Sequence, residues 1–229
     1  MKQYKVNEIF YSLQGEGSGT GQAAVFIRFY GCNRACPFCD TRLSTYELLT
    51  GEEIIERIQA LLKESPIEEN VSNIRFVLTG GEPTLQIDAE LCSLLGNNFS
   101  ATSVIQVETN GSTLTKISDN LLSRLFLTIS PKTLEDALSV AEWLNNEAWW
   151  FNKIEVKLIA KPLFDNDDNL EKTLAIFDRT RNETACYLQP LDTGDKTKNI
   201  EEINKCVNII KRNPRWRLSL QTHKIIGIR

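Results

Sequence analysis

Three cysteines, Cys32, Cys36 and Cys39, lie close together near the start of the chain. They form a C-x3-C-x2-C segment directly after an apolar and aromatic run at residues 23–30. Thiolates are soft ligands that suit zinc or iron–sulfur clusters. Three thiolates on one short loop can bind three irons of a cubane and leave the fourth iron open to the amino and carboxylate groups of a small molecule. The segment therefore favours a cluster with one open iron.

Structural zinc is an alternative ligand for these thiols. A structural zinc site usually has four ligands in two separated pairs, and the lone histidine, His223, lies far along the chain. Plain burial is a weaker explanation, because the segment is polar and dense in cysteine. The ligand count thus favours a cluster. The remaining cysteines, Cys92, Cys186 and Cys206, are scattered, and we expect them in the core.

The elements that must position these cysteines alternate between predicted strands and predicted helices. We expect strands at 23–30, 73–78, 103–107, 125–129, 154–159, 186–188 and 216–220, and helices at 52–63, 88–95, 134–144, 170–178 and 200–211. Strands that alternate with helices pair in parallel through right-handed crossovers. The pattern predicts an α/β fold, either doubly wound or a barrel. Polar and glycine-bearing segments follow several strands, where such folds gather their ligand sites.

Composition and charge set limits on the class of protein. The 229 residues contain no repeat or linker, so we expect a single domain over residues 1–229. The formal net charge of −4 gives no electrostatic reason to expect direct nucleic-acid binding. No apolar run approaches the roughly 18 residues of a membrane span, and the first residues lack the pattern of a secretory signal. We therefore expect a cytoplasmic protein that does not contact membranes.

The cysteine segment and one strand-end segment resemble the radical S-adenosylmethionine (SAM) superfamily. Its hallmark is C-x3-C-x-aromatic-C, and Phe38 is the aromatic residue here. Residues 79–83, Thr-Gly-Gly-Glu-Pro, resemble its GGE-type motif, although by themselves they could form an ordinary glycine turn. The resemblance covers nearly the whole chain. It implies a partial (βα) barrel with parallel strands, a 4Fe–4S cluster, SAM on the open iron and reductive cleavage of SAM to a 5′-deoxyadenosyl radical.

Other segments resemble a narrower family, 7-carboxy-7-deazaguanine synthase. They are residues 10–17 (FYSLQGEG), 26–33 (FIRFYGCN), 130–132 (SPK), 189–192 (QPLD) and 222–224 (THK). That family converts 6-carboxy-5,6,7,8-tetrahydropterin to 7-carboxy-7-deazaguanine with loss of ammonia, in the biosynthesis of queuosine and other 7-deazapurines. The resemblance implies a carbon–nitrogen lyase with a 4Fe–4S cluster, SAM and Mg²⁺. It also implies a homodimer and a flavodoxin- or ferredoxin-type reductant.

The resemblance assigns roles residue by residue. The metal ligands are Cys32, Cys36 and Cys39 for the cluster and Thr41 for Mg²⁺; the substrate contacts are Leu13, Gln14, Gly15, Arg28, Thr79, Glu108, His223 and Arg229; the SAM contacts are Phe38, Asp40, Gly81, Ser130, Pro131, Lys132, Gln189, Pro190, Leu191 and Asp192. The fork of a guanidinium suits the substrate carboxylate, and an amide such as Gln14 can both donate to and accept from a pterin edge. For Arg229, the contributing group would be the α-carboxylate.

The same residue types have ordinary explanations too. A lone arginine such as Arg28 is most often in a surface ion pair, a strand-end glutamate such as Glu108 is often solvated, and Asp40-Thr41 could be a turn or a helix cap. Two alternative functions also stay open. One is an enzyme that activates glycyl-radical enzymes, which shares Gly-Cys-Asn and Cys-Asp-Thr but not the segments at 14–17 and 222–224. The other is an iron–sulfur or zinc module without catalysis.

Overall fold

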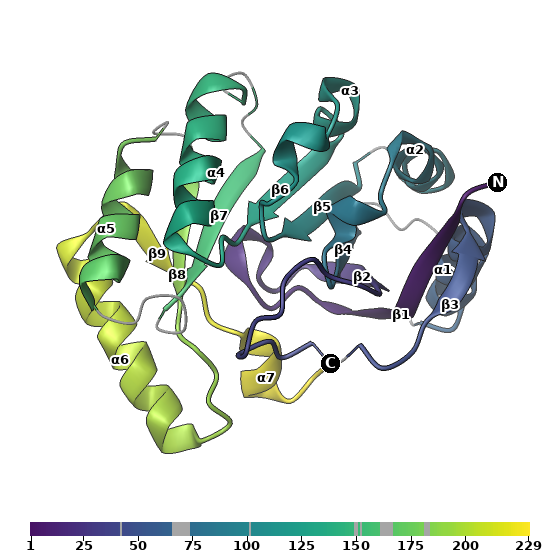
Figure 1. Cartoon of the computed structure of the whole chain (residues 1–229). Coiled ribbons are helices and arrows are strands. Elements are labelled where there is room, and N and C mark those ends of the chain that lie inside the picture. The colour runs from purple at the N-terminus through teal and green to yellow at the C-terminus, as the bar shows by residue number, and fades with distance from the viewer. Residues whose placement is uncertain are drawn as a thin grey trace.

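The computed structural model describes residues 1–41, 43–65, 74–100, 102–148, 151, 153–160, 167–180 and 184–229. Its strands form one nine-stranded sheet in the order β3-β1-β2-β4-β5-β6-β7-β8-β9. From β2 to β9 all neighbours are parallel, whereas β1 and β3 add to the β2 edge as antiparallel strands. The sheet curves without closing (Figure 1), which confirms the predicted α/β partial barrel.

The strands are β1 (Gln3–Leu13), β2 (Ala23–Phe29), β3 (Glu47–Thr50), β4 (Arg75–Gly80), β5 (Val104–Thr109), β6 (Leu125–Ile129), β7 (Ile154–Ile159), β8 (Ala185–Gln189) and β9 (Trp216–Leu218). The helices are α1 (Gly51–Lys63), α2 (Ala89–Asn98), α3 (Asp119–Leu122), α4 (Leu134–Asn146), α5 (Asp167–Asp178), α6 (Lys196–Arg212) and α7 (Thr222–Ile226). Every predicted strand and helix is confirmed with small shifts at its ends. The first residue of the predicted strand 73–78, Asn73, lies outside the described residues.

The sequence analysis missed β1, β3, α3 and α7. In β1 the side chains of Tyr4 and Val6 are buried, in the alternation that is typical of a strand. The register with β2 then shifts between Val6 and Glu8, which is a β-bulge. A bulge moves the following side chains to the opposite face, so the alternation breaks within the strand and its signal weakens. The other three elements have five residues or fewer.

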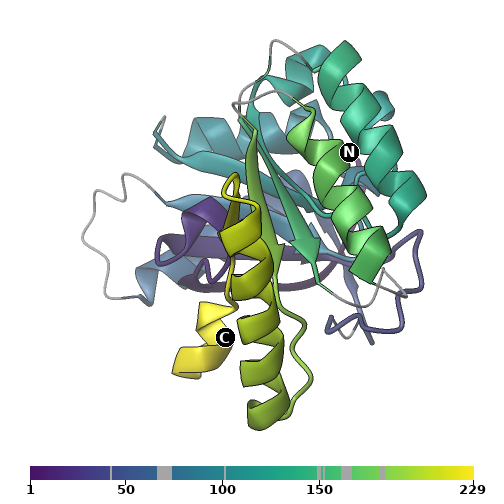
Figure 2. The same cartoon turned by 90° about the vertical axis from the view of Figure 1, so that its left-hand side faces the viewer.

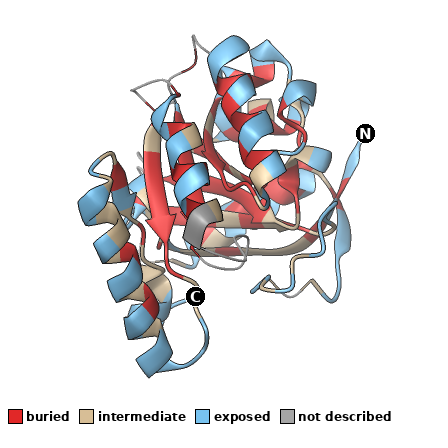
Figure 3. Cartoon of the chain, turned by 60° about the vertical axis from the view of Figure 1, so that its left-hand side comes forward, coloured by how far each residue is buried: buried red, intermediate tan, exposed pale blue. Residues whose placement is uncertain are grey.

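The larger helices cover the outside of the curved sheet, and each turns an apolar face toward it (Figures 2 and 3). Helix α1 begins with a capping box, in which Thr50 and Glu53 exchange side-chain to backbone hydrogen bonds. Cys92, Cys186 and Cys206 are at most 1% exposed, which confirms their predicted place in the core. In the described part of the chain, no helix is both long and apolar enough to cross a membrane.

The segment that follows β1 meets the C-terminal part of the chain beside the open edge of the barrel. We call residues 14–19 the strap and residues 219–224 the C-terminal segment. The Gly15 carbonyl oxygen accepts hydrogen bonds from both the backbone N–H and the hydroxyl of Thr222, each 3.0 Å long. Further along the strap, the Gly17 N–H donates to Ser219 Oγ and the Ser18 N–H donates to Glu155 of β7, again at 3.0 Å. The strap thus ties β1 to β7 and to the end of the chain.

The end of β4 lies directly against the loop that follows β2. The Gly81 N–H donates to the Phe29 carbonyl oxygen at 3.0 Å, and the Glu82 N–H donates to the Gly31 carbonyl oxygen at 2.9 Å. Gly80 has a φ of +117°, a conformation that favours glycine. A Cβ on Gly81 would collide with the Gly31 carbonyl group. The two backbones can therefore approach this closely only without a side chain at position 81.

We predict that Gly81→Ala destabilises the protein by about 1–3 kcal/mol, the usual cost of forcing extra atoms into a packed site. The matched control is Gly96→Ala, because a Cβ on Gly96, within α2, would meet open space. That change should stabilise by a few tenths to about 1 kcal/mol, since alanine is the better helix former. Urea unfolding measures both free energies. Equal stability of the two variants would contradict the close contact.

Candidate active site

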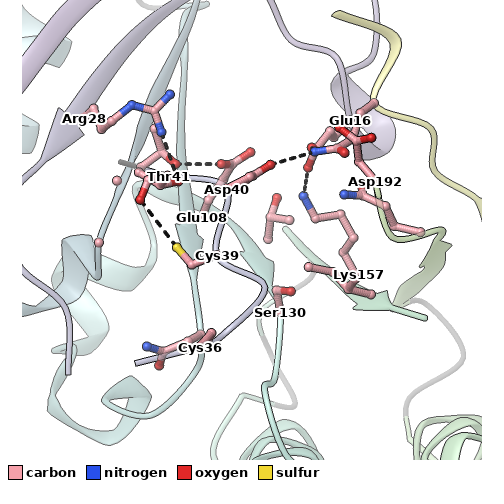
Figure 4. A pocket seen from close by; sticks show the side chains of 18 of the residues that line it. Glu16, Arg28, Cys36, Cys39, Asp40, Thr41, Glu108, Ser130, Lys157 and Asp192 are labelled. Atoms are coloured by element: carbon pink, nitrogen blue, oxygen red, sulfur yellow. Dashed lines mark hydrogen bonds and ion pairs between the residues drawn. The ribbon is translucent and has the colours of Figure 1, made fainter. Parts of the chain in front are cut away.

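A cavity of about 770 Å³ lies at the carboxyl ends of the parallel strands. Its walls include strand-end side chains from β2, β4, β5, β6, β7 and β8, together with the end of β1, the loop after β2 and the C-terminal segment. Ligand sites of α/β sheets and barrels are found at this end of the strands. Figure 4 shows side chains from these elements pointing into the same space.

Nearly all predicted site residues line this one cavity. They are Leu13, Gln14, Arg28, Cys32, Cys36, Phe38, Cys39, Asp40, Thr41, Thr79, Gly81, Glu108, Ser130, Lys132, Gln189, Pro190, Leu191, Asp192, His223 and Arg229. Gly15 and Pro131 are not in its lining. Gly15 instead packs against His223, where a Cβ would collide with the imidazole ring. The structure therefore gathers residues that are up to 216 positions apart, from Leu13 to Arg229.

The three clustered cysteines lie on the loop of residues 31–41, which we call the cysteine loop. All three are free thiols; Cys32 and Cys39 are exposed and Cys36 is half-buried. Burial raises the pKa of Cys36, and the nearby Lys132 ammonium opposes this shift. In the described residues no three His, Cys, Asp or Glu side chains converge on a point where one metal ion would fit. The irons of a cubane sit at separate corners, so its thiolates need not converge in that way, and three free thiols around one cavity fit such a cluster.

The first half of the cysteine loop is anchored to the strand ends beside it. The buried Glu82 carboxylate accepts from the Asn110 N–H at 2.7 Å and from the Thr109 hydroxyl at 2.8 Å. Asn110 in turn donates from its side-chain amide to Asn33 of the loop at 2.9 Å. Arg34 forms an ion pair with Asp136 of α4. Glu82 therefore supports the cysteine loop indirectly, because it fixes the turn that holds Asn33.

Glu108 at the end of β5 is held by two neighbours. Its carboxylate accepts from the Thr79 hydroxyl at 2.8 Å and from the Gln14 amide at 3.1 Å. The same Gln14 nitrogen lies 3.3 Å from the side-chain oxygen of Gln106, which also accepts from Arg75 at 3.0 Å. Gln14 is only 2% exposed, so its amide is turned toward these partners. The plane of the Glu108 carboxylate is therefore fixed before any ligand binds.

Two arginines share one glutamate on another wall of the cavity. Arg28 donates from Nε to Glu8 at 2.7 Å, and Arg229 forms an ion pair with the other oxygen of Glu8. Both guanidinium groups also lie near the Phe10 ring, at 5.8 Å and 4.5 Å from its centroid. The far end of Arg28 points to the Thr41 hydroxyl, 3.5 Å away (Figure 4). The end of Arg28 that faces the cavity keeps donors free of Glu8, and these suit an anionic ligand group.

A buried ion pair joins the strap to β7. The Glu16 carboxylate pairs with the Lys157 ammonium, and their side chains are 13% and 8% exposed. Burial alone would raise the pKa of Glu16, but the Lys157 charge outweighs it and the pKa is lowered. The pKa of Lys157 is raised, because the attraction of Glu16 and Glu108 outweighs the burial of its ammonium group. Both groups therefore stay ionised at the cavity wall.

Other charged groups of the cavity show shifted pKa values with clear causes. Burial lowers the pKa of Lys132, whose ammonium donates to Ser130 Oγ at 2.9 Å. Burial also lowers the pKa of His223, which favours a neutral imidazole. Hydrogen bonds from the Gly194 N–H, Lys224 and Asn199 lower the pKa of Asp192 to about 2. Asp192 is therefore a carboxylate throughout the physiological range.

The sequence analysis assigned no role to several residues that shape the cavity. They are Glu8, Phe10, Glu16, Lys157, Gln221 and Lys224. Phe10, Glu16 and Lys224 lie inside segments that had already been singled out, so their motifs could have suggested them. Glu8 lies on the part of β1 that was missed, and nothing in the local sequence marks Lys157 or Gln221 as cavity residues.

Comparisons with known proteins agree with this geometry. The sequence profile of the radical SAM superfamily matches residues 26–155. A 7-carboxy-7-deazaguanine synthase of Bacteroides thetaiotaomicron is 35% identical over 98% of this chain and 98% of that protein. A synthase of the same name from Haemophilus influenzae is 31% identical over 98% and 94%. The crystal structure of QueE from Escherichia coli matches with a TM-score of 0.64 at 22% identity, over 95% of this chain and 93% of that chain, which supports the fold.

These matches test the family expected from the sequence. The superfamily profile spans more than half of the chain, including the whole cysteine loop. The two synthases match from end to end with more than 30% identity. Both levels of the predicted resemblance are confirmed: this chain belongs to the radical SAM superfamily and, within it, to the 7-carboxy-7-deazaguanine synthase family.

Proposed function

We propose that this chain is a carbon–nitrogen lyase that converts 6-carboxy-5,6,7,8-tetrahydropterin to 7-carboxy-7-deazaguanine with loss of ammonia. One observation carries the proposal: the three thiols of the cysteine loop, Arg28 of β2 and the oriented carboxylate of Glu108 on β5 meet in one cavity, together with Arg229. The name of the relatives at 31–35% identity supports the same reaction. The direct test is to incubate reconstituted protein with SAM, a reductant and the pterin, and to look for the product.

The cysteine loop supplies the ligands for the cofactor. Cys32, Cys36 and Cys39 would hold a 4Fe–4S cluster, and SAM bound there supplies a 5′-deoxyadenosyl radical when it is cleaved. Apart from Pro131, the predicted SAM contacts all line the cavity: Phe38 and Asp40 on the loop, Gly81 after β4, Ser130 and Lys132 after β6, and residues 189–192 at the end of β8. This distribution fits a SAM molecule that would contact several strand ends at once.

The remaining groups suit the two ends of the pterin. Its carboxylate would bind at the Arg28 guanidinium, and the α-carboxylate of Arg229 would contact the substrate from the same wall of the cavity. Its ring carries adjacent N–H donors, which a carboxylate of fixed plane such as Glu108 can accept together. Neutral His223 and the residues at 13–15 would complete this side. Bound in this way, the ring lies between two opposite charges, and its orientation relative to the cysteine loop is set.

Magnesium, the partner proteins and the location in the cell remain parts of the proposal. Thr41 Oγ1 lies beside Arg28 and the cavity, where a Mg²⁺ ion could share substrate oxygens. We also propose a homodimer, a flavodoxin- or ferredoxin-type reductant and a cytoplasmic location, in a single-domain protein that does not contact nucleic acid directly. The net charge of −4 is consistent with the last point.

The first prediction concerns the cluster. Anaerobically reconstituted protein should hold about four irons per chain, as a cubane requires. Cys36→Ala should lose most of the iron and all SAM cleavage, because one of three thiolates is gone. Cys206→Ala is the matched control: Cys206 is buried on α6, away from the cavity, and this variant should keep its iron. Full iron content in Cys36→Ala, or stoichiometric zinc in the unaltered protein, would disprove the assignment.

The second prediction concerns the pterin carboxylate. Arg28→Ala should weaken pterin binding by about 2–5 kcal/mol, the usual cost of removing one partner of a desolvated charge pair. Cleavage of SAM in the absence of pterin should change little. Arg57→Ala removes an arginine whose ion pair with Glu47 is exposed on the surface, and it should leave pterin binding unaltered. If calorimetry shows weaker SAM binding and normal pterin binding in Arg28→Ala, the arginine belongs to the other ligand.

The third prediction concerns magnesium. Mg²⁺ should raise product formation far more than it raises uncoupled SAM cleavage, because a misplacement of about 1 Å can cost roughly 100-fold in rate. Thr41→Val keeps the shape of the side chain but lacks the oxygen, so most of the magnesium response should disappear. Thr41→Ser keeps the oxygen and should retain the response. The measurement is a titration with Mg²⁺ of the unaltered protein and both variants, in which product and 5′-deoxyadenosine are followed separately. Identical curves for the three proteins would show that Thr41 is not a ligand.

A further inference from the structure

The C-terminal segment connects three parts of the cavity mouth that are distant in sequence. The Gln221 amide nitrogen donates to Glu16 of the strap at 2.8 Å and lies 3.3 Å from an oxygen of Asp40 on the cysteine loop. The Gln221 side-chain oxygen accepts from the Lys224 ammonium at 3.0 Å. One side chain therefore links the strap to the second half of the cysteine loop.

Lys224 extends this connection to the loop after β8. Its ammonium lies 2.8 Å from Asp40 and 3.0 Å from Asp192. Because both carboxylate oxygens approach one nitrogen, they are at most about 6 Å apart, a distance at which like charges repel appreciably. Lys224 supplies the positive charge between them. Together with the Glu16–Lys157 pair, these contacts form a continuous network of polar groups at the mouth of the cavity. The network runs from Lys157 on β7 to Asp192 in the loop after β8.

The second half of the cysteine loop is held in place by this network of polar groups. The anchors at Gly31, Asn33 and Arg34 hold only its beginning. Beyond Cys36, the polar side-chain contacts that anchor the described residues of the loop to other elements are those of Asp40 and the Arg28–Thr41 hydrogen bond of 3.5 Å. Cys39 lies between these two positions. Its placement therefore depends on Asp40, and Asp40 is held by Gln221 and Lys224.

We propose that Gln221 and Lys224 are positioning residues that set the affinity for SAM and the coupling of SAM cleavage to product formation. They act through Asp40 and Asp192, which they hold at the two sides of the SAM site; this inference rests on the proposed function. Loss of either residue lets the second half of the cysteine loop move relative to the strap, which lies on the side of the cavity where the substrate would bind. The radical would then form at a variable distance from the substrate and would be spent without product.

The main test compares Lys224→Met with Lys224→Arg in the reconstituted holoenzyme. Lys224→Met keeps most of the side chain and removes the charge, so the Kd for SAM should rise about five-fold, the effect of a strong but partly exposed ion pair. Lys224→Arg should restore most of the affinity. Lys198→Met, a change of the same type on the exposed face of α6, is the control and should leave the Kd unaltered.

Two further readouts separate positioning from general damage to the fold. In iron-free protein, hydrogen exchange of residues 38–41 should be faster in Lys224→Met and in Gln221→Leu, whereas residues 75–80 of β4 should keep their protection. In holoenzyme, both variants should release more 5′-deoxyadenosine per product than the unaltered protein. An unchanged ratio and unchanged SAM affinity in Lys224→Met would overturn the inference.

A double-mutant cycle tests the proposed route through the carboxylates. Lys224→Met and Asp192→Asn should affect the Kd for SAM non-additively, because each removes one end of the same contact. Additive effects would show that Lys224 acts elsewhere. If the unaltered protein binds SAM but forms no deazaguanine product, the proposed function fails, and the SAM-binding and exchange measurements still test the inference by themselves.

Discussion

The contact between two glycine backbones, at Gly31 and Gly81, is the constraint on which the rest of the site depends. Because position 81 has no side chain, the end of β4 can donate two backbone hydrogen bonds to the chain leaving β2. The cysteine loop therefore starts at a fixed point and in a fixed direction, although its path to Thr41 contains no helix or strand. The glycines that look like a permissive turn in the sequence are needed here for close approach, which is a stricter demand.

The open barrel also leaves polar groups of the strap and of β7 beside a cavity, and these buried groups need partners. Glu155 is fully buried and accepts from the Ser18 N–H and the Thr128 hydroxyl. Glu16 and Lys157 satisfy each other nearby. Taking two such charges out of water is costly, and an unpaired one would cost about 3–5 kcal/mol. The pairing thus adds little net stability, but it strongly disfavours any arrangement in which the strap leaves β7.

Local features of the sequence were enough to predict the parallel strands, their helices and the group of three thiols on one loop. Apolar periodicity marks α1 within a few residues, and three cysteines on one loop need no knowledge of the fold. The contacts of Lys157 and Gln221 could not be predicted in this way, because their partner Glu16 is 141 and 205 positions away. Strand β1 was missed because its bulge interrupts the alternation. Residues in these contacts become recognisable only when the curvature of the barrel brings the strap beside β7 and the C-terminal segment.

The anchors around the cavity differ in strength, and this difference determines where the molecule can open. Beneath the cavity, Arg75, Gln106 and Thr128 are buried and linked by hydrogen bonds of 2.7–3.0 Å. At the mouth, the Asp40 side chain is 60% exposed and that of Lys224 is 33% exposed, so their ion pair is worth at most about 1 kcal/mol. This ion pair can therefore break at far less cost in free energy than the buried hydrogen bonds of the floor. Glu108 is joined to this floor through Gln14, whose amide also reaches Gln106, so its carboxylate keeps its orientation when contacts at the mouth change.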